Sequence, residues 1–210
     1  MFTGIIESLG TINNIQESKS SLKVAISVSD IIFNEAIIGA SIAINGVCLT
    51  VVKKEKNQNL LFFDIINETL SKTNLKSLRV SEKVNLETAL KFGNGLDGHM
   101  VQGHIDTIGT IVNNQLVDDN WLLEIMIDKH WIKYCIQKGS IAIDGISLTI
   151  SSINEKHNNQ HGIISISIIP HTLDNTNLKH KSKDDTVNIE TDFFGKYIEK
   201  FLQARMEHNE

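Results

Sequence analysis

The sequence of 210 residues predicts an all-β protein built from two copies of one small domain, with a helix at its C-terminal end. Three observations support this fold class. Residues 41–50, SIAINGVCLT, return as residues 140–149, SIAIDGISLT. Most apolar segments are short, rich in β-branched residues and bounded by turn formers, as in the strands of a barrel or sandwich. The C-terminal residues instead carry apolar side chains at helical spacing.

The duplication extends over most of the chain. Residues 1–12 return at an offset of 99 as residues 100–111, whereas residues 68–75 match residues 171–178 at an offset of 103. The second copy therefore holds four extra residues, which we place in the polar loop near residues 156–162. A period near 100 residues is too long for a solenoid, and each copy is large enough to hold its own core.

The glycine-rich residues 93–98 link the two copies. We therefore expect a first repeat over residues 1–98, a second over residues 99–191 and a tail over residues 192–210.

The predicted strands are short apolar runs. In the first copy they lie at residues 22–28, 41–44, 47–51 and 60–66, and in the second at residues 121–127, 141–143, 146–150 and 163–169. Asn45-Gly46 and Asp144-Gly145 separate two such runs at equivalent points, which predicts a type I′ hairpin turn or a sharp kink at each. Pro170 follows the last run, where a sheet tolerates proline. Short helical turns are expected at residues 68–74, 129–138 and 172–177.

Composition excludes several classes of protein. A hydrophobic content of 41% and a net charge of −5, without a dense stripe of basic residues, predict a soluble globular protein with no nucleic-acid partner. No apolar run reaches the roughly 18 residues of a membrane span, and residues 1–9 lack the basic start of a secretory signal. The two cysteines, in dissimilar contexts, predict no disulfide framework. We expect a cytoplasmic protein with no membrane partner.

The tail predicts an amphipathic helix. Its apolar positions fall on one stripe, at Phe194, Tyr197, Ile198, Phe201, Leu202 and Met206. The first copy has no counterpart of this stripe after Glu87. The helix either packs on its own chain or meets the same helix of other subunits, and the bulky side chains favour assembly.

Four of these segments resemble a known family. They are MFTGI at residues 1–5, NGVCLT at 45–50, GHMVQGHID at 98–106 and DGISLT at 144–149. In this order and spacing they resemble riboflavin synthase, alpha chain, and the resemblance covers essentially the whole chain. It implies two tandem six-stranded Greek-key β-barrels, each a lumazine-binding repeat, and a C-terminal helix that holds a homotrimer.

The resemblance also implies a transferase reaction. Two molecules of 6,7-dimethyl-8-ribityllumazine exchange a four-carbon unit, which gives riboflavin and 5-amino-6-(D-ribitylamino)uracil. No metal or redox cofactor is needed, and an association with lumazine synthase stays open. His99 and His104, five residues apart, would lie on opposite faces of one strand, so we expect no metal site there.

Two identical substrates must act as donor and acceptor, so we expect the two repeats to differ at their sites. They differ at the pairs Phe2 and Val101, Ile5 and His104, Asn45 and Asp144, Cys48 and Ser147, and Glu68 and His171. Together with the resemblance, these differences make Phe2, Cys48, His104 and Ser147 the candidate catalytic residues.

His104 is the sharpest candidate, because an apolar Ile5 fills its place in the first copy. An imidazole is suited to moving a proton from the acidic 7-methyl group at neutral pH. The alternative is a surface or structurally bonded histidine. Cys48 and Ser147 can hydrogen-bond or add to the electrophilic C7, although a free cysteine is more often a small buried hydrophobe. The alternative nucleophile is a hydroxide or another group.

The candidate substrate-binding residues lie in short segments around these four. In the first copy they are Gly4, Ile5, Ile6, Cys48, Leu49, Thr50, Asp64, Ile65, Ile66, Asn67, Glu68 and Thr69. In the second copy they are Gly103, His104, Ile105, Lys138, Ser147, Leu148, Thr149, Ile168, Ile169, Pro170, His171, Thr172 and Leu173. The glycines let backbone approach a ligand, and strand-end peptide groups can read the pyrimidine edge. The threonines and Lys138 have plain alternatives, β-propensity and a solvated surface position.

We expect each working site between the first barrel of one subunit and the second barrel of a neighbour. Phe2 and Cys48 would stand in one half, and His104 and Ser147 in the other. The alternative function is a non-catalytic lumazine or flavin carrier on the same fold, similar to the antenna lumazine proteins. The four catalytic candidates and the apolar tail favour the enzyme.

Overall fold

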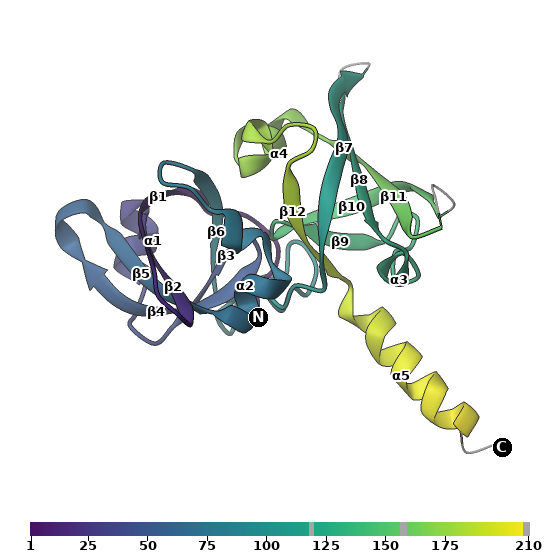
Figure 1. The fold of residues 1–210 in the computed structure, drawn as a ribbon, viewed down its shortest axis with the longest axis horizontal. Coiled ribbons are helices and arrows are strands. Elements are labelled where there is room, and N and C mark those ends of the chain that lie inside the picture. The colour runs from purple at the N-terminus through teal and green to yellow at the C-terminus, as the bar shows by residue number, and fades with distance from the viewer. Residues whose placement is uncertain (118–119, 156–158, 208–210) are drawn as a thin grey trace.

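Two closed antiparallel barrels and one long helix make up the computed structural model, which describes residues 1–117, 120–155 and 159–207 (Figure 1). The first barrel contains β1 (Ser8–Glu17), β2 (Ser21–Ser27), β3 (Ser41–Ile44), β4 (Val47–Glu55), β5 (Leu60–Ile66) and β6 (Lys83–Thr88). The second contains β7 (Thr107–Val117), β8 (Asn120–Asp128), β9 (Ser140–Ile143), β10 (Ile146–Asn154), β11 (His161–Ile168) and β12 (Thr186–Thr191).

Both barrels have the same strand order. In the first barrel β2 pairs with β5, and β3 pairs with both β4 and β6, so neighbours in the sheet are often distant in sequence. The second barrel repeats these pairings with β8, β11, β9, β10 and β12. The predicted pair of six-stranded Greek-key barrels is confirmed.

Side-chain alternation explains the strands. On β2, Leu22, Val24 and Ile26 point inward, and on β5 Leu61, Phe63 and Ile65 do the same. The second barrel has a separate core that is rich in isoleucine. Because side chains fill both interiors, a ligand must bind on the outside of a barrel. All eight predicted runs are strands. The other four strands, β1, β6, β7 and β12, belong to the six expected in each repeat, but their residues were not assigned from the sequence.

Short helices connect the strands, three of them where helical turns were expected, at residues 68–74, 129–138 and 172–177. They are α1 (Asp30–Glu35), α2 (Asn67–Lys72), α3 (Lys129–Ile132) and α4 (Pro170–Asp174), with 3₁₀ turns at Lys56–Gln58, Asn74–Ser77 and Asn177–His180. Pro170 opens α4, where its missing N–H leaves no helical bond unmade. The inserted residues fall between β10 and β11, and residues 156–158 of that turn lie outside the described residues.

The two predicted hairpin turns meet at the junction of the barrels. Residues 45–46 and 144–145 all have positive φ, as a type I′ turn requires. A Cβ on Gly46 would lie 2.6 Å from the backbone N of Gly145, so the turns touch through their backbones. The Asp144 carboxylate is buried there, and it accepts hydrogen bonds from the side chain of Asn177 and the N–H of Asn188, both at 2.8 Å. Burial raises the pKa of Asp144.

The segments that precede the barrels cross between them. Phe2 and Val101 form an antiparallel bridge, with N–H···O distances of 2.7 and 3.0 Å. Ile6 then packs against the core of the second barrel, and Ile105 packs against the core of the first. The strands of each barrel lie within the predicted repeats, whereas the segment before each barrel contacts the opposite barrel.

The helix α5 (Phe193–Glu207) extends away from the second barrel (Figure 1). Its first turns are held by Lys196 on Asp106 at 2.7 Å and by Glu199 on Lys133 at 2.6 Å. The predicted apolar stripe is exposed, up to 71% at Phe201. No helix in the described part of the chain is long and apolar enough to cross a membrane.

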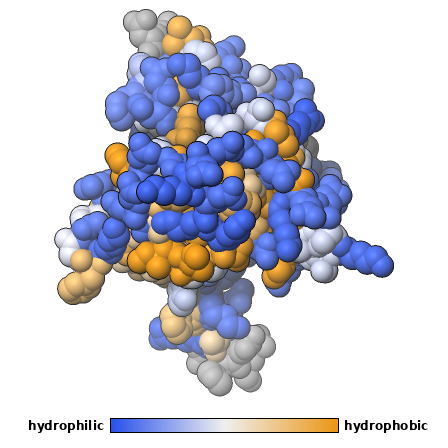
Figure 2. Space-filling model, turned by 90° about the vertical axis from the view of Figure 1, so that its left-hand side faces the viewer, coloured by the Kyte–Doolittle hydropathy of each residue, from blue (hydrophilic) through white to orange (hydrophobic). Residues whose placement is uncertain are grey.

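The outer face of the first barrel is largely hydrophilic, with hydrophobic side chains gathered along its lower part (Figure 2). Large exposed apolar side chains of this barrel include Ile31 on α1 and, directly after that helix, Ile37 and Ile38. The molecule therefore exposes apolar side chains on the first barrel as well as on α5.

Candidate functional site

Two small cavities lie at equivalent places on the outside of the barrels. The first half-site, of about 250 Å³, is lined by Val47, Cys48, Glu68, Thr69, Lys72, Thr73, Gly103, His104 and Ile105. The second half-site, of about 140 Å³, is lined by Gly4, Ile5, Ile6, Ile146, Ser147, His171, Thr172, Asn175 and Thr176. Each combines a strand and a short helix of one barrel with the crossing segment of the other repeat.

A glycine carbonyl attaches each crossing segment to the opposite barrel. The Cys48 N–H donates to the Gly103 carbonyl at 2.9 Å, and the Ser147 N–H donates to the Gly4 carbonyl at 2.7 Å. Gly4 has φ +76° and Gly103 has φ +81°. A Cβ on either glycine would stand within 2.7 Å of the side chain at residue 147 or 48. Only glycine fits both the conformation and the space.

This crossing corrects the expected distribution of catalytic residues between the halves. His104 was expected beside Ser147, because both belong to the second repeat. The structure instead places His104 with Cys48 in the first half-site. Its counterpart Ile5 lines the second half-site with Ser147. The expectation failed because His104 lies on a crossing segment, which leaves its own repeat and packs on the opposite barrel, whereas Ser147 stays on the second barrel.

His99 is a site residue that sequence reasoning did not assign. Its Nδ1 lies 2.7 Å from the Ser147 hydroxyl, and only 9% of the residue is exposed. Burial lowers the pKa of His99, which favours the neutral imidazole. No regular strand joins His99 and His104, so the two do not lie on opposite faces of one strand. His99 contacts Ser147, and His104 lines the first half-site. Among the described residues, no group of His, Cys, Asp and Glu is arranged to hold a metal ion.

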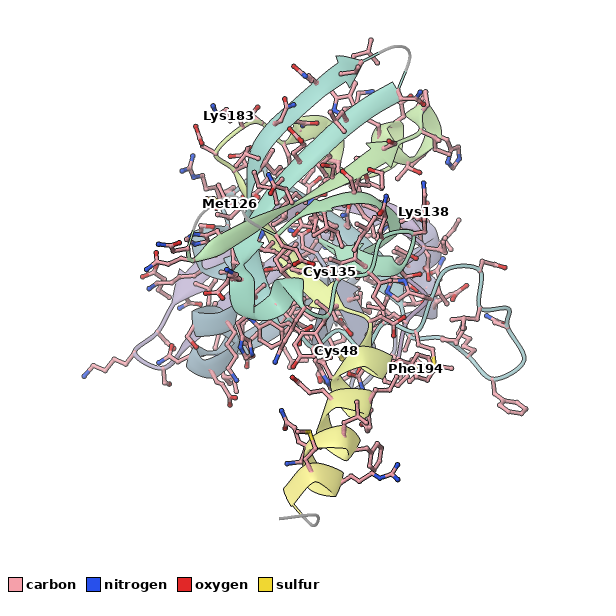
Figure 3. The ribbon with its side chains drawn as sticks, turned by 90° about the vertical axis from the view of Figure 1, so that its right-hand side faces the viewer. Cys48, Met126, Cys135, Lys138, Lys183 and Phe194 are labelled. Carbon is pink, nitrogen blue, oxygen red and sulfur yellow. The ribbon has the colours of Figure 1, made fainter. Side chains whose placement is uncertain are left out.

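The two thiols have different environments (Figure 3). Cys48 is half-buried and lines the first half-site. Cys135 is buried, burial raises its pKa to about 12, and its thiol donates to the Trp131 carbonyl. Since the thiolate is the reactive form, burial and the raised pKa make Cys135 poorly reactive, and Cys48 is the more accessible thiol of the two.

Several predicted binding residues do not line either half-site. Leu49, Ile65 and Ile168 point into the barrel cores, and Leu148 and Leu173 pack against the second core. Others are exposed away from the two cavities: Thr50, Asp64, Ile66, Asn67, Lys138, Thr149, Ile169 and Pro170. Lys138 stands in a turn with φ +68° before β9 (Figure 3). The remaining predicted binding residues do line a half-site.

Phe2, expected among the catalytic residues, is 0% exposed. It packs with Val101, Ala43 and Ala142 where the crossing segments meet. A side chain without accessible surface touches no substrate directly, so its contribution is to hold the crossing.

Two larger cavities lie elsewhere. One, of about 450 Å³, opens at the barrel junction beside Arg79, Glu82 and Lys181. The other, of about 470 Å³, lies between Glu7, Glu35 and the linker. Neither contains Cys48, His104 or Ser147. Because these three candidate catalytic residues all line the smaller pair, we assign the site there.

Comparisons with known proteins show which proteins this chain is similar to. Residues 3–89 and residues 102–192 each match the family described as lumazine binding domain. A riboflavin synthase of Actinobacillus pleuropneumoniae is 40% identical over 202 residues, covering 96% of this chain and 90% of that protein. The riboflavin synthase of Bacillus subtilis (strain 168) is 37% identical over 208 residues, covering 99% and 93%.

Two solved structures of LumP are similar in fold to this chain. LumP complexed with 6,7-dimethyl-8-(1'-D-ribityl) lumazine superposes with a TM-score of 0.79 at 28% identity, covering 91% of this chain and 99% of that chain. LumP complexed with flavin mononucleotide superposes with a TM-score of 0.80, at the same identity and coverage.

Proposed function

The chain belongs to the riboflavin synthase family, and from this membership we propose how its two half-sites perform the reaction. Two molecules of 6,7-dimethyl-8-ribityllumazine exchange a four-carbon unit, which gives riboflavin and 5-amino-6-(D-ribitylamino)uracil. The observation that carries the proposal is the pair of equivalent cavities with different reactive groups. Cys48 and His104 line one, and Ser147 with His99 stands at the other.

Non-equivalent half-sites suit a dismutation, because one substrate donates carbons and its identical partner accepts them. In the first half-site, His104 removes a proton from the 7-methyl group of its substrate. In the second, neutral His99 accepts the Ser147 proton as the hydroxyl adds to C7. The contact of 2.7 Å between Nδ1 of His99 and the Ser147 hydroxyl supports this step. Glu68, Thr69 and Thr172 bind ribityl hydroxyls.

Each half-site is too small to enclose a substrate alone. Ligand pockets usually measure about 300–1,000 Å³, against about 250 and 140 Å³ here. We therefore propose that the first half-site of one subunit faces the second half-site of a neighbour in a homotrimer. The exposed stripe of α5 supports assembly, since contiguous apolar surface of this kind is typical of a contact with another chain.

A carrier function is the second candidate, because LumP is similar in structure and was solved with lumazine and flavin ligands. Two observations favour the enzyme. The nucleophilic and imidazole groups are present in both half-sites, and the curated synthases are more similar in sequence than LumP. The deciding experiment incubates purified protein with the lumazine and follows riboflavin absorbance. Tight binding without product would favour the carrier.

A further inference from the structure

Two buried carboxylates occupy equivalent positions near the ends of β6 and β12. Glu87 is 4% exposed and Glu190 is 2% exposed. Both accept hydrogen bonds from the glycine segment that precedes their own barrel. Glu87 accepts from the Thr3 N–H at 2.6 Å, the Thr3 hydroxyl at 2.8 Å and the Gly4 N–H at 3.0 Å.

Glu190 makes the corresponding contacts in the second repeat. It accepts from the Gln102 N–H at 2.7 Å, the Gly103 N–H at 2.9 Å and the His104 N–H at 3.2 Å. Burial raises the pKa of both glutamates, and three donors to each carboxylate offset part of that cost. A buried carboxylate with three donors fixes the position of the backbone that supplies them.

The same peptide units reach the opposite barrel. In the peptide between Gly103 and His104, the N–H donates to Glu190 and the carbonyl accepts from the Cys48 N–H. That peptide is therefore held between the last strand of the second barrel and the nucleophile position of the first.

The other crossing is built with one extra link. The Gly4 carbonyl accepts from the Ser147 N–H, and the N–H of the same peptide, at Ile5, donates to the Thr3 hydroxyl at 3.2 Å. That hydroxyl in turn donates to Glu87. Gln102, the counterpart of Thr3, has no hydroxyl, and there the glutamate bonds the peptide directly.

We propose that Glu87 and Glu190 are positioning residues, and that each sets the geometry of the half-site on the opposite barrel. Glu190 acts through Gly103 on Cys48 and His104, and Glu87 acts through Thr3 and Gly4 on Ser147. The proposal rests on the proposed function for the meaning of the half-sites, but the contacts themselves do not depend on it.

Cys48 provides a reporter for this cross-barrel effect. Gly103 covers it closely, and the other thiol, Cys135, is buried and poorly reactive. The experiment measures the alkylation of Cys48 by iodoacetamide in the full chain without substrate, site by site, by mass spectrometry. Glu190→Gln turns one acceptor oxygen into an NH₂ group, so at least one buried N–H loses its partner. Loss of a hydrogen bond to a charged group corresponds to about a tenfold change in an equilibrium, and we expect alkylation to accelerate about tenfold.

Glu87→Gln, on the same barrel as Cys48, is expected to leave the alkylation rate at Cys48 nearly unchanged. Glu7→Gln is the matched control. The Glu7 carboxylate accepts from the N–H and hydroxyl of Thr88 but does not bond the glycine segment. A structural role in stability alone would move both glutamate variants together, so equal acceleration in the two, or in neither, overturns the proposal.

A mirrored experiment moves the reporter to the other half-site. In a chain with Cys48→Ser and Ser147→Cys, Glu87→Gln and Thr3→Val accelerate alkylation at position 147, while Glu190→Gln and Thr3→Ser leave it nearly unchanged. Thr3→Val keeps the buried charge and the side-chain volume, so it tests the relay even if a glutamate variant fails to fold. Acceleration by Glu190→Gln at position 147 contradicts the crossed arrangement.

Riboflavin formation is measured on the same variants in their natural Cys48 background. A crossed alkylation pattern without any riboflavin from the parent chain refutes the proposed function and leaves the positioning role intact. Riboflavin formation by the parent with uncrossed alkylation refutes the positioning role alone.

Discussion

Replacing Gly103 by alanine tests the close approach of the crossing segment to the first barrel. The added Cβ would lie 2.6 Å from the Cys48 Cβ and 2.9 Å from the Cys48 N. The backbone φ of +81° is a second obstacle. Gly39 offers a matched control, because its φ is +89° but nothing lies within 4 Å of its added Cβ. Gly39→Ala therefore measures conformational strain alone.

The two substitutions share one cost and differ in another. The left-handed conformation costs an alanine about 1–2 kcal/mol at either position. Only Gly103→Ala adds the overpacking against Cys48, about 1–3 kcal/mol, and weakens the Cys48–Gly103 hydrogen bond, about 0.5–1.5 kcal/mol. We expect the free energy of unfolding to fall by about 2–4 kcal/mol more for Gly103→Ala than for Gly39→Ala.

Urea denaturation followed by circular dichroism measures both losses. Both tryptophans lie in the second barrel, at positions 121 and 131, so fluorescence would report on that barrel alone. Steady-state riboflavin formation on the same samples should be lost in Gly103→Ala and kept in Gly39→Ala. If Gly103→Ala is as stable and as active as Gly39→Ala, the crossing segment does not pack on Cys48 as described.

Four further outcomes are expected. His104→Ala should lower turnover about 10²–10⁴-fold while fold and ligand affinity are kept. A turnover rate within about two- or threefold of the parent in steady-state kinetics would reject the proton-transfer role. Removal of residues 193–210 should leave folded barrels that no longer form a trimer, and a trimer seen in sedimentation would contradict this. Inactive Cys48→Ala and Ser147→Ala chains should regain part of their activity on mixing, because some mixed trimers hold an intact pair of half-sites. If no riboflavin-forming activity returns after subunit exchange, each chain works alone. Burial raises the Asp144 pKa above its ordinary 3.8. The contribution of Asp144 to the free energy of unfolding is therefore full below pH 3.8 and is lost as the pH rises through the pKa of the folded state. Chemical denaturation from below pH 3.8 upward should show a weaker dependence of stability on pH for Asp144→Asn than for the parent.

The barrels were predictable because their strands carry local patterns. Alternation at residues such as Leu22, Val24 and Ile26 marks one buried face, and the repeated turn residues mark where strands reverse. The strands that escaped prediction are more polar. In β1, Ile12 is buried but is followed directly by two exposed asparagines, and one of its two pairing partners, β6, lies far away in sequence.

The exchange of the crossing segments was not predictable from the sequence, for a reason that lies in the duplication itself. Gly4 and Gly103 occupy equivalent positions of the two repeats and would meet equivalent backbone on either barrel. Pattern and propensity are therefore nearly the same for a segment that stays on its own barrel and for one that crosses. The Phe2–Val101 bridge decides the path, and it joins residues that only the folded chain brings together.

His99 escaped for a related reason. At the offset of 99 that relates the two copies there, its counterpart would precede Met1, so a comparison of the repeats has nothing to set beside it. Its burial and its contact with Ser147 arise because Gly98 packs against that side chain and the His99 N–H donates to the Thr3 carbonyl. A residue directly after the linker thus becomes part of a site on the second barrel.

The exchange explains how one duplicated fold obtains two different half-sites. Each half-site takes its strand from one repeat and its glycine segment from the other. Within one repeat, a substitution in the strand and a substitution in the glycine segment therefore alter different half-sites. The first half-site combines Cys48 with His104, whereas the second combines Ser147 with apolar Ile5. An imidazole still reaches the second nucleophile, because His99, directly after the linker, contacts Ser147. Cys48 beside the exposed His104 and Ser147 beside the buried His99 then offer different environments to two identical substrates, which is the asymmetry that a dismutation needs.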